Sequence, residues 1–161
     1  MLDDMLPLAK RVDGSMFLSR ALGAEAELEH ARGNHAAARM AIDDALEGVL
    51  GTTAVVHWFV ILVPAAIVLP PDRACDVIGR VRVHATVPMF EAALLEAEGL
   101  VERDVGASRK AADLYSSLGL PYQEARARLE AGDRGRAAEL VHRFGLQAGP
   151  VGQRLAGLDA G

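Results

Sequence analysis

The sequence has little cysteine, few aromatic residues and no excess of positive charge. Cys75 is the single cysteine among 161 residues, so an intrachain disulfide and a cysteine-based zinc site are excluded. Aromatic residues make up 4% of the chain, whereas packed β-sheets are usually rich in aromatic and β-branched residues. The formal net charge of −5 does not favour binding to the phosphates of DNA or RNA, and we expect no direct nucleic-acid partner.

Signals for export are also missing, because the first residues, MLDDM, carry two acids and no basic start. Together with the single cysteine, this favours a cytoplasmic protein. One long apolar run, Ala54–Leu69, contains sixteen residues without Asp, Glu, Lys or Arg. A membrane-spanning helix needs about 20 apolar residues, and this run is shorter and contains Pro64. We interpret it as a buried helix; a helix that docks on a partner and a membrane span are the two alternatives.

Abundant alanine and leucine, with apolar residues at helical spacing, predict an all-α fold with about seven to nine helices. Capping and turn residues divide the chain into expected helical segments. These segments are 15–33, 34–51, 54–69, 73–83, 88–101, 104–119, 121–132 and 133–145. No segment alternates as a strand would, and the glycine-rich tail 147–161 is expected to be only partly ordered.

Three glycines that we interpret as turn residues, Gly33, Gly99 and Gly132, lie 33 or 66 residues apart, close to the period of tetratricopeptide repeats. Small or capping residues recur at identical offsets around the first and the last of them: Ala26, Asn34, Ala38 and Ile42 in one case, Ala125, Asp133, Ala137 and Val141 in the other. Gly99 fits less well, because the next capping residue, Asp104, follows five residues later. The pattern predicts a short right-handed solenoid of antiparallel helical hairpins over residues 1–146, with a plain helical bundle as the alternative.

A family resemblance adds to this pattern. Its residues are Ala111, Leu114, Tyr115, Leu118, Gly119, Leu120, Pro121, Tyr122, Ala125, Arg126, Leu129 and the run Ala131–Arg134. They belong to a stretch, 90–145, that resembles the tetratricopeptide-like helical region of actinobacterial LuxR-type ATPase regulators and class III nucleotide cyclases. The chain has no G-x-x-x-x-G-K-[ST] phosphate loop, no room for a cyclase domain and no basic helix-turn-helix after the tail. The resemblance therefore implies a sensor or adaptor region alone.

Candidate chemistry is sparse in the sequence. His30 and His35 are five residues apart and are expected on different helix faces, while His57, His84 and His142 have no neighbour at metal-ligand spacing. Acids occur close together at Asp43–Asp44, Glu96 and Glu98, and Glu102 and Asp104, where a solvated helix face explains them. Neither Cys75 nor Ser116–Ser117 has a histidine at a spacing that implies a nucleophile. We predict no catalytic residue, no cofactor and no metal site.

Two groups of side chains are candidates for binding. The first consists of Val56, Trp58, Phe59 and Val60 in the apolar run, which are either an interface or part of the core. The second consists of Arg126, Arg128, Arg134 and Arg136, which alternate with acids. These arginines either form intrahelical ion pairs or contact an acidic partner.

The sequence favours a non-enzymatic protein–protein interaction module or signalling scaffold. Its partner would be a protein, a peptide or a second copy of the chain. One alternative is a small-molecule sensor domain of a transcriptional regulator or cyclase, with a ligand between repeats. Another is a helical enzyme in which distant acids and histidines converge in a cleft.

Overall fold

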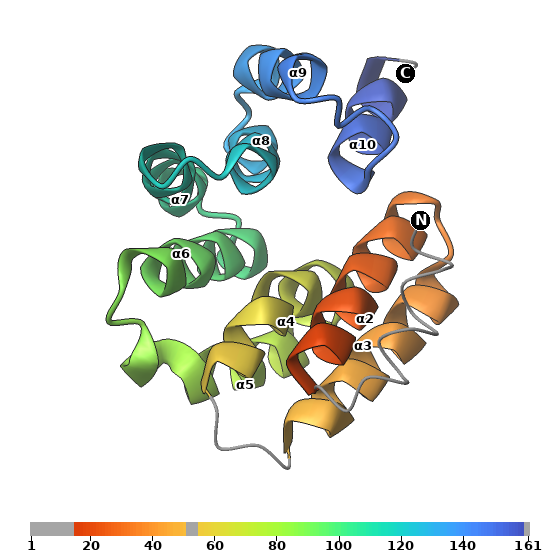
Figure 1. The fold of residues 1–161 in the computed structure, drawn as a ribbon, viewed down its shortest axis with the longest axis vertical. Helices are drawn as coiled ribbons and strands as arrows, with labels where there is room; N and C mark the ends of the chain where they lie inside the picture. Colours follow the sequence, from red (N-terminus) through yellow and green to blue (C-terminus); the bar gives the residue numbers. More distant parts are fainter. Residues whose placement is uncertain (1–14, 51–54, 160–161) are drawn as a thin grey trace. The chain divides into compact units, whose positions relative to one another are not determined.

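The computed structural model describes residues 15–50 and 55–159, and these ranges contain helices and turns but no strand. Their nine α-helices and one 3-10 helix are shown in Figure 1. The elements are α2 (Ser15–Ala31), α3 (His35–Leu50), α4 (Val55–Val68), α5 (Pro71–Val81), η1 (Arg82–His84), α6 (Pro88–Glu102), α7 (Val105–Ser117), α8 (Pro121–Glu130), α9 (Arg134–Arg143) and α10 (Pro150–Asp159). The prediction of an all-α fold is confirmed.

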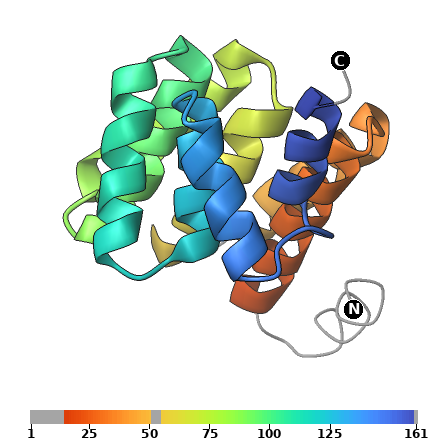
Figure 2. The same cartoon turned by 90° about the horizontal axis from the view of Figure 1, so that it is seen from above.

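Internal contacts divide the chain into two compact units, residues 1–84 and 85–161, where the sequence suggested one domain over 1–146. In unit 1, α2 contacts both α3 and α4, α3 contacts α4, and α4 contacts α5. In unit 2, α6 to α9 contact one another in chain order, and α8 also contacts α6 and α10 (Figure 2). Within each unit, then, helices pack against their sequence neighbours and against next-but-one helices. The handedness and path of a solenoid stay predictions.

The core of unit 1 is built on α4, whose buried residues are Phe59, Ile61, Leu62, Val63, Pro64, Ala65 and Val68. The apolar run forms a helix over Val55–Val68 that is largely buried from Phe59 onward, whereas Val56 in its first turn is exposed; Ala54 lies outside the described residues. No helix in the described ranges is long and apolar enough to span a membrane. Pro64 cannot donate a backbone hydrogen bond to the Val60 carbonyl. Gly23 of α2 lies against both, since a Cβ there would be 3.3 Å from the Pro64 ring and 3.6 Å from the Val60 oxygen.

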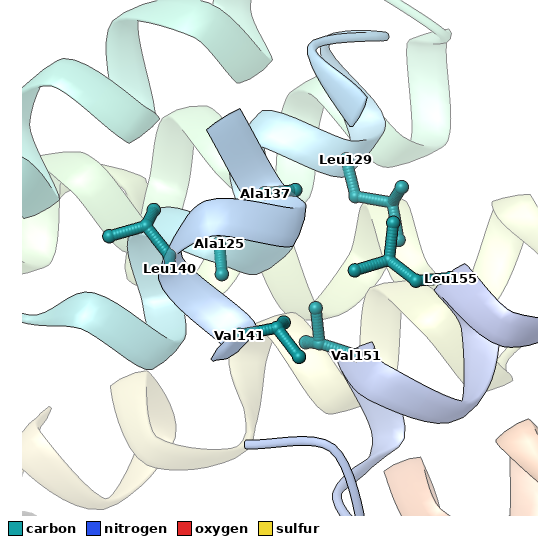
Figure 3. Close-up of a cluster of buried hydrophobic side chains, with 7 residues drawn as sticks. All are labelled: Ala125, Leu129, Ala137, Leu140, Val141, Val151 and Leu155. Atoms are coloured by element: carbon teal, nitrogen blue, oxygen red, sulfur yellow. The ribbon is translucent and has the colours of Figure 1, made fainter. Parts of the chain in front are cut away.

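Unit 2 has smaller core side chains. One cluster joins α6, α7 and α8 through Ala92, Ala111, Ala112, Tyr115 and Ala127. A second cluster, drawn in Figure 3, joins α8, α9 and α10 through Ala125, Leu129, Ala137, Leu140, Val141, Val151 and Leu155. Two members of the second cluster come from the segment 147–161, which was expected to be only partly ordered. That segment contributes a packed helix, α10.

The hairpin turns at Gly33 and Gly132 have the same backbone structure. Both glycines have positive φ, 82° and 77°, a conformation that glycine adopts without the steric penalty of a Cβ. Each glycine N–H donates to the carbonyl three residues earlier, and the next N–H, of Asn34 or Asp133, donates to the carbonyl five residues earlier. This pattern is the Schellman ending, which satisfies the last carbonyls of a helix.

The prediction of a turn at Gly99 is wrong. Gly99 lies inside α6, buried, and the turn between α6 and α7 is at Arg103, which has a φ of 56°. The Asp104 N–H donates to the Gly99 carbonyl, and the Asp104 side chain caps α7 by accepting from the Gly106 N–H at 2.8 Å. Gly99 is needed for packing instead, because a Cβ there would lie 2.5 Å from the Ser108 Oγ.

Candidate functional site

Three helical hairpins can be aligned on their turn residues, which are Gly33, Arg103 and Gly132. Seven residues before the turn are Ala26, Glu96 and Ala125; five residues after it are Ala38, Ser108 and Ala137; nine residues after it are Ile42, Ala112 and Val141. All nine side chains are buried. The hairpin at Arg103 therefore follows the same plan as the other two, except that it carries Glu96 and Ser108 where they carry alanine.

That carboxylate forms an ion pair inside unit 2. Glu96 of α6 is completely buried, and Arg126 of α8 is nearly so. The Arg126 Nε and Nη2 atoms donate to the two Glu96 oxygens at 2.6 and 2.9 Å. The guanidinium also lies 5.5 Å from the centre of the Tyr122 ring. Two parallel charge-assisted hydrogen bonds are the strongest form of such a pair, and they tie α6 to α8.

Tyr115 of α7 completes this cluster, which we name the Glu96 cluster: Glu96, Tyr115, Tyr122 and Arg126. Burial raises the pKa of the Tyr115 phenol well above its ordinary value, and the Glu96 charge adds to the effect. Because the Glu96 carboxylate is inaccessible to solvent and held by Arg126, it is not available to exchange protons with a substrate. The geometry serves to join three helices.

Two of the other predicted arginines, Arg128 and Arg136, also pair with acids, both within a helix and between helices, whereas Arg134 is exposed and has no ion pair with a described residue. The Arg128 Nη2 donates to Asp113 of α7 at 2.7 Å, and its Nε lies 3.7 Å from Glu124. Arg136 of α9 lies 3.6 Å from the same Glu124 and donates to Glu139 at 2.9 Å. The hydrogen bond to Glu139 raises the pKa of Arg136. Pairing within a helix and pairing across α7, α8 and α9 thus each explain part of the arginine pattern.

The structure brings together two histidines that the sequence separated. The rings of His30 and His35 lie across the Gly33 turn, with centroids 5.0 Å apart and an edge-to-face orientation. Beside them, hydrogen bonds from Asn34 and Arg32 lower the pKa of Glu29. Over residues 15–50 and 55–159, no group of three or more His, Cys, Asp or Glu side chains is placed to hold a metal ion.

The predicted interface residues do not share one surface. Phe59 is buried, Trp58 is half-buried with Arg80 at 5.6 Å from its ring, and Val60 is half-buried on α4. Val56 is the one that is exposed, at 40%. The structure therefore assigns three of these side chains partly or wholly to packing within unit 1.

Two other exposed apolar side chains, which sequence analysis did not select, lie near helix ends in unit 1. Phe17 is 61% and Leu50 is 60% exposed, in the first turn of α2 and the last turn of α3. Helices α2 and α3 form a hairpin around Gly33, which brings residues 17 and 50 to the same end. The first turn of α4 is at this end of unit 1 as well (Figure 1).

Sequence analysis missed the Glu96 cluster and the exposed apolar side chains of unit 1, and the sequence carries a different signal for each. The Glu96 cluster joins residues 30 positions apart, and its signal is the carboxylate at an alanine position of the repeat, which is visible once the turn is placed at Arg103. The exposure of Phe17, Leu50 and Val56 depends on which residues of three helices face solvent, and the uniformly apolar α4 has no polar face to mark its exposed side.

No protein-family model, curated protein or solved structure matches the chain.

Proposed function

We propose that the chain is a non-enzymatic interaction module of the cytoplasm, which binds a protein or a peptide segment through its helical hairpins. The observation that most supports this proposal is the recurrence of one hairpin plan at Gly33, Arg103 and Gly132, with buried side chains at the same offsets. Repeated helical hairpins bury their cores between neighbours and leave extended surfaces for partners. The resemblance of residues 90–145 to helical regions of large regulators supports a role of such a module in signalling.

The roles of the polar side chains also support an interaction module over an enzyme. Asp104 and Asp133 cap helices, accepting backbone hydrogen bonds from Gly106 and Arg136. Glu96 is buried against Arg126, and the Ser117 hydroxyl donates to the Leu114 carbonyl at 2.7 Å. These groups stabilise helices and their packing, which is what a scaffold requires of them.

The proposal is tested by selecting peptides from a random phage-displayed library against the immobilised full chain. We expect the selected peptides to converge on one sequence pattern, and a synthetic peptide with that pattern to bind saturably in calorimetry. As a control, binding should disappear at a temperature where circular dichroism shows the helices to be unfolded. Failure to converge, together with a small molecule retained by the purified protein in a native mass spectrum, would contradict the proposal and favour a sensor.

A further inference from the structure

Helix α10 is held on the α8–α9 hairpin by a small set of side chains. Its buried apolar residues, Val151 and Leu155, are four positions apart and therefore share one face of the helix. Figure 3 shows Val151 pointing toward Val141 of α9 and Leu155 pointing toward Leu129 of α8. An ion pair lies beside them, between the Arg154 Nη2 atom and the Glu130 Oε1 atom of α8, at 2.5 Å. We name Leu129, Glu130 and Val141 the α10-binding surface.

The sequence of α10 gives this helix little stability of its own. Gly152 and Gly157 both lie within its ten residues, and glycine is among the poorest helix formers. No acidic residue in its first turn and no basic residue in its last turn complements the helix dipole. Isolated helices this short are marginal in water even when they are rich in alanine. The structure of α10 therefore depends on its contacts with α8 and α9.

A surface that holds so weak a helix can hold a stronger helix with the same contacts more tightly. Val151, Arg154 and Leu155 supply those contacts, and anchors spaced in this way are how a groove recognises an amphipathic helix. We propose that α10 occupies the partner-binding surface of the module. The partner is an amphipathic helix that displaces α10 and carries two aliphatic residues four positions apart, with an arginine directly before the second. This inference rests on the proposed function and names the surface and the kind of segment that it binds.

Two glycine variants of the full chain change the docking of α10 in opposite directions. A Cβ on Gly152 would lie 2.6 Å from the Gln147 Cα and 2.7 Å from its carbonyl carbon, so Gly152→Ala forces α10 away from the backbone that precedes it. A Cβ on Gly157 meets nothing within 4 Å, so Gly157→Ala strengthens the helix without a clash and is the matched control.

The probe for both variants is a fluorescent peptide of residues 150–159 that carries Gly152→Ala and Gly157→Ala, which raise its helix content. In the wild-type chain the tethered α10 competes with this peptide at a high effective concentration. We expect the Gly152→Ala chain to bind the probe about tenfold or more tighter than the wild type does, because its own α10 no longer competes. The Gly157→Ala chain should bind the probe no more tightly than the wild type. Fluorescence anisotropy measures both.

The ion pair allows a test that a folding defect cannot imitate. Glu130→Arg places a second cation opposite Arg154. The Glu130→Arg chain should therefore prefer a probe that carries Arg154→Glu, whereas the Gly152→Ala chain should prefer the probe with arginine. Glu102→Arg, an exposed charge reversal on α6, should keep the preference for arginine when it is combined with Gly152→Ala.

The outcomes separate this inference from the proposed function. A Gly152→Ala chain that binds the probe no more tightly than Gly157→Ala, or a Glu130→Arg chain that still prefers the arginine probe, would overturn the inference. If the library selection nevertheless converges on a pattern, the proposed function stands with its binding surface elsewhere on the chain. If the selection fails as well, both fall.

Discussion

The two units use the same glycine turn between helices, at Gly33 and Gly132, but they differ in the side chains that fill the space between their helices. Unit 1 packs around an almost wholly apolar α4, and Gly23 allows α2 to lie directly against Pro64 of that helix. Unit 2 uses alanines and serine for close contact and encloses the ion pair of Glu96 with Arg126. The difference teaches that one hairpin plan accepts either large apolar side chains or a paired charge at its interior positions, provided that the neighbouring side chains are small enough.

The largest expected effect is on the ion pair of unit 2. Arg126→Met leaves the Glu96 carboxylate buried without its partner, which should lower the free energy of unfolding by about 3–5 kcal/mol. Glu96→Leu combined with Arg126→Met should recover most of this loss, because no charge then remains buried. Urea denaturation followed by circular dichroism measures both. Fluorescence of Trp58, the single tryptophan, reports on unit 1 in the same samples. A single variant as stable as the wild type would show that the pair does not hold unit 2 together.

The next effect compares the two close-packed glycines. Gly99→Ala should destabilise unit 2 by about 1–3 kcal/mol through overpacking, because its Cβ would meet the Ser108 side chain at 2.5 Å and the Ser108 nitrogen at 3.0 Å. Gly23→Ala in unit 1 should be milder, since its nearest contact is 3.3 Å. Gly79→Ala, inside α5 with nothing within 4 Å, is the control and should stabilise by about 0.5–1 kcal/mol. A thermal denaturation midpoint that falls further in Gly23→Ala than in Gly99→Ala would contradict this comparison.

A smaller effect on stability is expected from substitutions at the turn residues Arg103 and Gly132. Arg103 holds a left-handed conformation that disfavours residues with a Cβ by roughly 1–2 kcal/mol, so Arg103→Gly should stabilise unit 2 by about 1 kcal/mol. At the equivalent turn, Gly132→Ala should destabilise by a similar amount. Denaturant midpoints of the two variants should therefore move in opposite directions, and equal signs would contradict the alignment of the turns.

How much of this the sequence predicts depends on the kind of signal. Helix starts and ends at residues such as Gly33, Asp104 and Asp133 were predictable, because glycine endings and carboxylate caps are local interactions. The helix α10 was missed because glycine lowers helix propensity along residues 149–157, whereas Val151 and Leu155 gain enough from burial against α8 and α9 to compensate.

The errors at the candidate site have a different origin. Gly99 was mistaken for a turn because a glycine that permits close packing and a glycine that permits positive φ look identical in sequence. Glu96 was assigned to a solvated face because its partner, Arg126, is on another helix. Both errors concern contacts between helices, which no local pattern encodes.

The smallest expected effect concerns Tyr115, whose contribution to stability changes only at alkaline pH. The pKa of Tyr115 is raised in the folded chain, so above pH 10, where an exposed tyrosine loses its proton, the unfolded chain binds fewer protons than the folded one. Stability from this group is complete below that pH and is lost as pH rises further. We expect Tyr115→Phe to weaken the alkaline loss of stability in denaturant titrations at several pH values. An identical pH profile for wild type and variant would show that Tyr115 does not cause it.

The central claim is that this chain is a non-enzymatic interaction module. A native mass spectrum of the unmodified protein tests it most directly, because one spectrum reports the number of subunits and any retained small molecule. The account predicts subunits of 17.1 kDa, single or assembled, with no small molecule added. A monomer that carries a small-molecule adduct would contradict it.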